Sequence, residues 1–113
     1  MTIEELLTVL PLETVAGQDG LKREISGGYS SDLLSNVMGQ ASSGALWVTM
    51  QGHQNIVAVA ALIDISAVIV AGGASVDSQA ILKAQNEHVV ILKTSLPVFE
   101  LVGRLYNLGI HGV

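Results

Sequence analysis

Residues 45–71 read ALWVTMQGHQNIVAVAALIDISAVIVA, and this stretch decides the fold. Its two ends are short apolar runs, which predict buried strands over 45–50 and 66–71. The polar residues 51–53 predict a loop, and the residues that follow predict a helix over 54–63. A strand, a helix and a second strand in this order form a unit whose strands lie parallel and are joined by a right-handed crossover.

The same alternation continues on both sides of this stretch. The further elements that the pattern predicts are a helix over 3–9 with a capping box at Thr2 and Glu5, strands over 12–16 and 21–25, a loop over 26–31, a helix over 32–38, a loop over 39–44, a loop over 72–75, a helix over 76–87, a strand over 89–93, a loop at 94–95 and a helix over 96–108 that Gly109 ends. We therefore predict one α/β domain over residues 1–113. Its sheet is mostly parallel, is built from successive strand–loop–helix units and has helices on both faces.

The composition excludes several classes of protein. Half of the 113 residues are apolar and only 13% are charged, which argues against a disordered chain. Ten acidic and five basic residues give a net charge of −5, so we expect neither nucleic acid nor a membrane surface as a partner. The first residues lack the basic segment of a signal peptide, and the apolar run 56–71 is shorter than the ~20 residues that span a bilayer. The absence of cysteine fits a reducing cytoplasm, where we expect the protein.

The helix predicted over 54–63 has an unusual surface. Residues 56–63 contain no polar position, and a helix that is apolar on all sides must be covered on all sides. We expect a second copy of the protein to cover it in a two-fold homodimer; cover by the N-terminal helix or an edge strand of the same chain is the alternative. The candidate interface residues are Ile56, Val57, Val59, Ala60 and Ile63.

Polar loops follow the predicted parallel strands. The carboxyl ends of parallel strands meet at one edge of the sheet, where ligands bind in a crevice, and each loop leads to a helix N-terminus that suits an anion. This arrangement favours a small anionic ligand such as a nucleotide. The alternative is that the loop residues serve only as turns and helix caps. The candidate ligand-binding residues are Gly27, Gly28, Thr49, His53, Asn55, Gly72, Gly73, Thr94 and Ser95.

The sequence does not contain the common catalytic motifs. A phosphate loop, a dinucleotide-binding glycine fingerprint and a nucleophile elbow are all missing, and His53, His88 and His111 lack the spacing of metal ligands. We therefore expect no catalytic residue, no metal and no cofactor. A histidine side chain can act as a general base near neutral pH, so His53 is the remaining candidate, but the sequence identifies no nucleophile or acid to act with it. A structural role for His53 is the alternative.

Residues 25–35, ISGGYSSDLLS, resemble the DRTGG domain family, and the resemblance extends over roughly 12–110. Gly27 and Gly28 match the two glycines of the motif that names the family, whereas Ile25 stands where the motif has arginine. The family is similar to the N-terminal domain of HPr kinase/phosphorylase, whose phosphate loop lies in its other domain. The resemblance implies an α/β module, commonly dimeric, that accompanies catalytic or ligand-sensing domains. We expect a stand-alone, non-catalytic regulatory or interaction module that homodimerises, with a nucleotide or anion sensor as the alternative.

Overall fold

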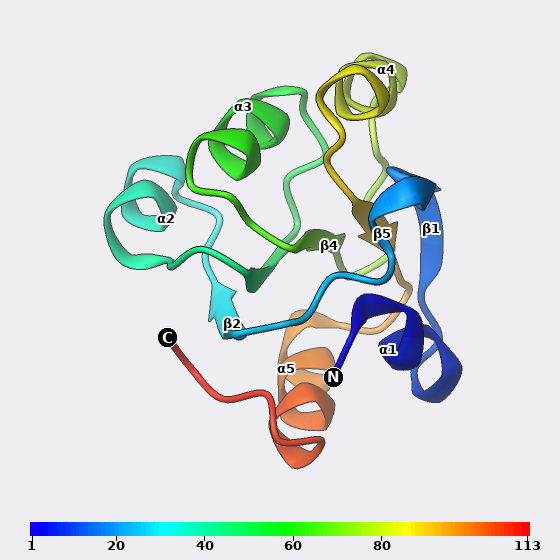
Figure 1. Ribbon diagram of the computed structural model, residues 1–113, viewed down its shortest axis with the longest axis vertical. Coiled ribbons are helices and arrows are strands. Elements are labelled where there is room, and N and C mark those ends of the chain that lie inside the picture. The colour runs from blue at the N-terminus through cyan, green and yellow to red at the C-terminus, as the bar shows by residue number, and fades with distance from the viewer.

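The computed structural model describes residues 1–113 and contains a five-stranded sheet with five α-helices (Figure 1). The elements are α1 (Ile3–Val9), β1 (Glu13–Ala16), a 3₁₀ helix (Gln18–Gly20), β2 (Gly27–Ser30), α2 (Leu34–Gln40), β3 (Ala45–Thr49), α3 (Asn55–Leu62), β4 (Ala67–Val70), α4 (Ser78–Glu87), β5 (Ile91–Lys93) and α5 (Val98–Asn107). The strand order is β1-β5-β4-β3-β2, in which β2 to β5 are parallel and β1 is antiparallel to β5. The predicted fold class is therefore confirmed.

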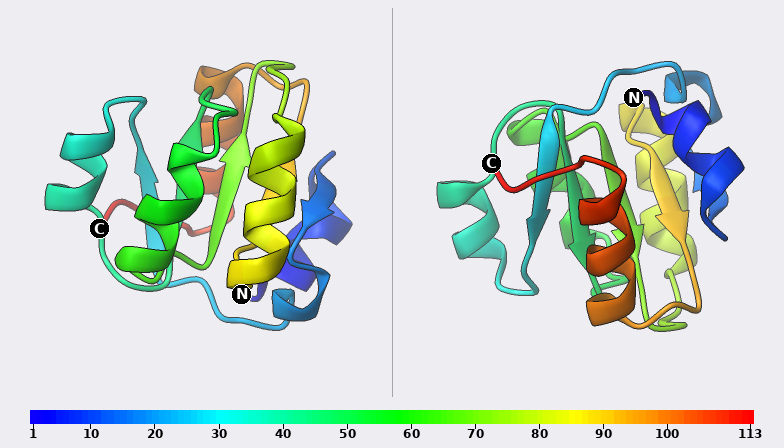
Figure 2. Two further views of the ribbon diagram at one scale, coloured as in Figure 1. Left: turned by 90° about the horizontal axis from the view of Figure 1, so that it is seen from above. Right: turned by 90° about the horizontal axis from the view of Figure 1, so that it is seen from below.

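The helices are unevenly divided between the two faces of the sheet. Figure 2 shows α2, α3 and α4 side by side on one face and α1 and α5 on the other. The consecutive strands β2 to β5 are neighbours in the sheet, so right-handed crossovers place all three connecting helices on the same face. Trp47 and Val68 belong to the core beneath α2 to α4, and Leu46 and Ile69 belong to the core beneath α1 and α5. Burial on both faces explains the almost continuous apolar sequences of the central strands.

The burial of α3 corrects one expectation. Ile56, Val57, Val59 and Ala60 are all buried within the single chain, where α3 is the middle helix of three and has the sheet beneath it. These four side chains therefore offer no surface for a second copy, whereas Ala58, Ala61 and Leu62 on the outer side of α3 remain exposed. Ile63 is half-buried. Homodimerisation itself stays a prediction.

The region before β3 differs from the predicted pattern. Residues 27–30, expected in a loop, form the edge strand β2 and pair in parallel with residues 45–48. Residues 21–25, expected as a strand, instead run past the start of α1, where the Glu4 N–H donates to the Leu21 carbonyl over 2.7 Å. The apolar alternation in 21–25 reflects the packing of Leu21 and Ile25 on the core. The glycines of β2 have a low strand propensity, which pairing with β3 overrides.

The predicted capping box is confirmed. Thr2 and Glu5 form the predicted capping box of α1. His88 ends α4 in the left-handed conformation, with φ of 57°. None of the helices combines the length and the apolar character that crossing a membrane requires.

Asp64 joins three segments at the edge of the sheet where the parallel strands begin, here called the amino edge. Its carboxylate accepts hydrogen bonds from the Arg23 guanidinium at 2.9 Å and from the Ser43 hydroxyl at 2.6 Å. The hydrogen bond from Arg23, followed by that from Ser43, holds the pKa of Asp64 below its ordinary value. Asp64 has φ of 59°, a left-handed conformation that Asp and Asn tolerate better than most residues.

We predict that Asp64→Asn changes how stability depends on pH. A carboxyl whose pKa is lower in the folded chain than in the unfolded chain stabilises the fold above its unfolded pKa, and this contribution is lost as the pH falls through the folded pKa. Urea unfolding of wild type and Asp64→Asn at a series of pH values should therefore show a stability difference that shrinks once the pH drops below 3.8, the ordinary value. The exposed Glu87, which has no side-chain hydrogen bond, supplies the control Glu87→Gln. A wild-type advantage that does not change with pH would contradict this role of Asp64.

Candidate functional site

The predicted ligand residues do not form a single crevice. Strands β2 to β5 all end at one edge of the sheet, here called the carboxyl edge. A ligand crevice forms where adjacent loops turn to opposite faces of the sheet. The connections between β2 and β5 all turn to the same face, so no such point occurs among these strands. The chain changes face only after β5, where α5 crosses to the other side.

A hollow of about 570 Å³ lies at this change of face, between the ends of β4 and β5 and the start of β1. Three of the predicted residues, Gly73, Thr94 and Ser95, line it. Sequence reasoning did not select Lys93 and Glu13, which also line it and whose Nζ and Oε2 atoms are 3.9 Å apart. Only the antiparallel pairing of β1 with β5 brings these two residues together, so nothing local in the sequence could reveal the contact.

Hydrogen bonds within the chain hold the walls of this hollow. Gly72 and Gly73 both have φ of 70°, a conformation that favours glycine, and their N–H groups donate to the carbonyls of Leu96 and Thr94. The Thr94 hydroxyl donates to the Pro11 carbonyl at 2.9 Å and accepts the Leu96 N–H at 3.2 Å. The glycines are thus explained by the turn. The polar side chains left for a ligand are the hydroxyls of Ser75 and Ser95 and the exposed pair of Lys93 and Glu13.

Thr49 has a structural partner at the end of β3. Its buried hydroxyl donates to Asp32 Oδ1 over 2.7 Å, and the Met50 N–H donates to the same oxygen over 2.8 Å. These bonds fasten the end of β3 to the segment after β2. Sequence reasoning gave Asp32 no role. Residues 26–31 were expected in a loop, so Asp32 was not seen to follow a parallel strand. An acidic residue just beyond a parallel strand is the signal that would have identified it.

His53 lies two residues before the start of helix α3. Its Nδ1 atom accepts the Asn55 N–H at 3.1 Å, and its carbonyl accepts the Ile56 N–H at 3.1 Å. Nδ1 therefore accepts the N–H of the first residue of α3, which places the ring hydrogen of the neutral side chain on Nε2. Asn55 is the exposed first residue of α3. This geometry supports the structural interpretation of His53 rather than a general base.

Gly27 and Gly28 are the first two residues of the edge strand β2, and the last residues of the chain pack against them. The Gly28 N–H donates to the His111 carbonyl at 2.8 Å, and the Val113 N–H donates to the Gly28 carbonyl at 3.3 Å. A Cβ atom on Gly27 would overlap the Val113 side chain and lie 2.9 Å from the His111 oxygen. The close approach of residues 111–113 therefore explains Gly27 without any ligand, whereas a Cβ atom on Gly28 would only contact Ile110 at 3.5 Å.

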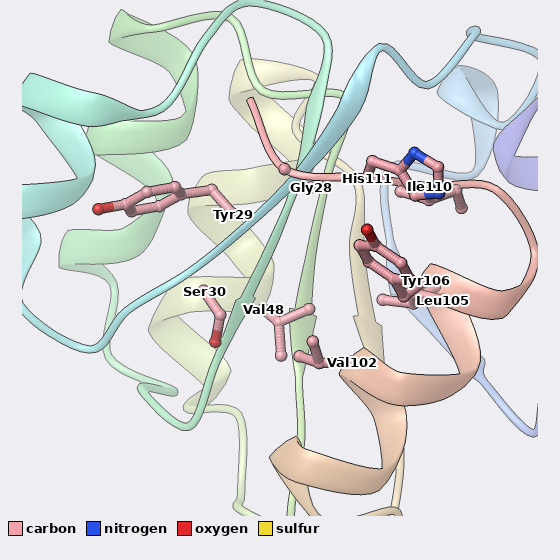
Figure 3. Close-up of a pocket in the computed structure, with 10 residues that line it drawn as sticks. Gly28, Tyr29, Ser30, Val48, Val102, Leu105, Tyr106, Ile110 and His111 are labelled. Atoms are coloured by element: carbon pink, nitrogen blue, oxygen red, sulfur yellow. The ribbon is translucent and has the colours of Figure 1, made fainter.

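A second, smaller hollow lies between β2 and α5. It has a volume of about 110 Å³, and Figure 3 shows Val48, Val102 and Tyr106 around it. The ring of His111 packs against that of Tyr106, with centroids 4.3 Å apart. This hollow depends on how the last residues fold back over β2, so sequence reasoning missed it. No group of three His, Asp or Glu side chains is arranged to hold a metal ion.

We predict that loss of the His53 imidazole destabilises the start of α3. His53→Ala removes the acceptor for the Asn55 N–H and should lower the free energy of unfolding by about 1 kcal/mol. His53→Asp supplies another favourable capping oxygen and should keep most of that stability, although it removes the imidazole. Urea unfolding of the three proteins provides the measurement. Equal losses in both variants would show that the imidazole does something other than cap α3.

Comparison with known proteins adds evidence on the fold. The sequence matches no family model and no curated protein. The structure is similar to the crystal structure of the CBS and DRTGG domains of the regulatory region of Clostridium perfringens pyrophosphatase, complexed with its activator, diadenosine tetraphosphate. The TM-score is 0.73 at 15% identity, and the match covers 90% of this chain and 44% of that chain. This chain thus corresponds to less than half of that structure, and the likeness establishes a shared fold, in keeping with the DRTGG-like architecture that the resemblance implied.

Proposed function

We propose that this protein is a non-catalytic regulatory or interaction module that works as a homodimer. The observation that carries the proposal is that polar groups at the carboxyl edge are used to hold the fold. The side chains of Thr49, His53 and Thr94 all make hydrogen bonds that fasten their own loops. The shared fold with domains of a pyrophosphatase regulatory region supports the same assignment.

The dimer contact must lie on a surface other than the buried side of α3. Leu62 is the only large apolar side chain of α3 that is exposed. Helix α5, in contrast, carries Phe99, Val102 and Tyr106 as exposed large apolar side chains, and Leu108 follows them. Neighbouring exposed apolar side chains mark an interaction site. We therefore assign self-association to α5 in place of the helix over 54–63 that the sequence suggested.

We predict that light scattering on the purified chain at micromolar concentration will give the mass of two copies. Leu62→Glu places a charge on the exposed side of α3 and should leave that mass unchanged, because α3 takes no part in the contact. A wild-type mass of one copy, or dissociation caused by Leu62→Glu, would contradict the assignment. Turnover of a metabolite by the purified protein would contradict the non-catalytic part of the proposal.

The second candidate function is a sensor for a nucleotide or another small anion. The hollow between β4, β5 and β1 favours it, because Lys93 and two exposed serine hydroxyls line this hollow. Helix α5 begins three residues after Ser95, at Val98, and no side chain caps its first N–H groups, which suit an anion. The structurally similar regulatory region binds a nucleotide activator, which makes nucleotides the first ligands to test.

We predict that, if this second function holds, a nucleotide will raise the melting temperature of the protein. The panel contains ATP, diadenosine tetraphosphate and inorganic phosphate, and a ligand at 100 times its Kd adds about 2.7 kcal/mol. Lys93→Glu should abolish the shift. Lys22→Glu makes the same change of charge near the amino edge and should preserve it. The absence of any shift at millimolar ligand, or an equal shift in Lys93→Glu, would rule out a ligand in this hollow.

A further inference from the structure

The last residues of the chain pair with the outer side of β2 as an added strand would. Residues 111–113, here called the strap, run parallel to β2, and Gly112 is the bridge partner of Gly28 (Figure 2). The Gly28 N–H donates to the His111 carbonyl at 2.8 Å, and the Val113 N–H donates to the Gly28 carbonyl at 3.3 Å. This is the hydrogen-bond pattern of a parallel ladder. The outer side of β2 therefore accepts an extended segment.

The strap uses only half of this edge. In the ladder with β3, the Ser31 N–H donates to the Val48 carbonyl. Backbone groups of successive residues alternate between the two sides of a strand, so those of Gly28 and Ser30 face outward. The groups of Gly28 bond to the strap, whereas no segment bonds to those of Ser30 on the outer side.

The strap is held much less firmly than the residue before it. Ile110 is buried, and its N–H donates to the Leu105 carbonyl at 3.1 Å. All three residues of the strap are exposed, and two backbone bonds and the contact of the His111 ring with Tyr106 hold them. A segment with few buried contacts and exposed hydrogen bonds opens locally at a low free energy. The strap can therefore leave β2 while Ile110 stays in place.

Two hollows adjoin the free half of the edge. The smaller hollow beside the strap and a second hollow of about 540 Å³ share Ser30, Val102 and Tyr106 as lining residues. Phe99, Val102 and Tyr106 form an exposed stripe of α5 along the second hollow. An apolar cavity of about 150 Å³ holds a benzene ring, so the second hollow has room for a phenyl side chain.

The pairing determines which side chain of an added strand would meet this second hollow. Ser30 pairs with Val48, which belongs to the core beneath α1 and α5, and paired residues of neighbouring strands point to the same face of a sheet. A residue opposite Ser30 on an added strand therefore points toward α5 and the second hollow. The residue before it points to the other face, as Val113 does where its side chain lies against Gly27.

We propose that the strap covers a strand-binding site, and that an extended segment of a partner protein displaces it, adds to β2 in parallel and places a large apolar side chain opposite Ser30 in the second hollow. In this mode of recognition, backbone hydrogen bonds supply affinity and the side-chain pocket supplies specificity. The strap indicates the class of ligand, because it is itself an extended segment bound at this edge. This inference goes beyond the proposed function by naming a partner, and it does not require a homodimer. The bound segment and a second copy would compete for the stripe of α5.

A pair of synthetic peptides tests the site. The acetylated and amidated peptide Ile-His-Gly-Val-Phe repeats residues 110–113 and adds phenylalanine at the position that faces Ser30. The control peptide Ile-His-Gly-Val-Asp has aspartate there. Calorimetric titration should show that the phenylalanine peptide binds about 10-fold more tightly or better, because its ring is buried. In the complex, the Ser30 amide should become protected from hydrogen exchange measured by NMR.

Variants of the protein test the strap and the second hollow separately. Val113→Pro removes the N–H that bonds to Gly28 and should lower the Kd of the phenylalanine peptide about fivefold, because the strap then competes less. Gly103→Leu fills the second hollow from α5 and should remove the advantage of phenylalanine over aspartate, while it improves helix propensity. The matched control is Gly39→Leu in α2, where a Cβ atom also meets nothing within 4 Å. It should leave both Kd values unchanged.

The outcomes separate this inference from the homodimer. If neither the wild type nor Val113→Pro binds at millimolar peptide, the strand-binding site is overturned, and a mass of two copies in light scattering would still leave the homodimer standing. Equal affinity for the two peptides, or equal effects of Gly103→Leu and Gly39→Leu, would place the peptide elsewhere and overturn the site as well. Binding that Val113→Pro does not tighten would overturn the role of the strap as a cover.

Discussion

The handedness of the crossovers between parallel strands determines most of the structure. Strands β2 to β5 are laid down in order across the sheet, and each right-handed crossover places its helix on the same face. This single constraint crowds α2, α3 and α4 together and leaves α1 and α5 to cover the opposite face. It buries Ile56, Val57, Val59 and Ala60 of α3 within one chain and leaves the outer side of the helix exposed. It also leaves part of the opposite face beside β2 open, where the exposed stripe of α5 lies.

The sequence predicted the elements whose apolar pattern is local and regular. The helices and strands after residue 44 all exist, with ends within a few residues of the expected positions, because burial on both faces leaves a continuous apolar run. The prediction failed where the decisive contact is distant in sequence. Nothing in Gly27 or Gly28 indicates a strand until Ala45 and Leu46 pair with them. Likewise, the composition of 56–63 shows that α3 needs cover but cannot say which neighbours provide it.

The candidate site shows the same limit. Sequence reasoning correctly placed polar residues at the ends of parallel strands, but it assumed that these ends converge. With all connections on one face, Thr49, Gly73 and Gly28 belong to three separate surroundings. Their chemistry also has local explanations that the sequence alone could only state as alternatives: a buried hydroxyl bound to Asp32, a left-handed turn, and a close backbone approach. The contact between Glu13 and Lys93, in contrast, required the whole sheet to be known.

The way in which the last residues cross β2 has a consequence for solubility. An unpaired edge strand is a template on which another chain can add a strand, and long flat edges promote aggregation. Here the segment through Gly112 crosses the outer side of β2 and takes up both backbone groups of Gly28. At the opposite edge, β1 has four residues and an irregular register between Thr14 and Ala16. Both edges of the sheet therefore offer little regular, unpaired backbone on which another chain could add a strand.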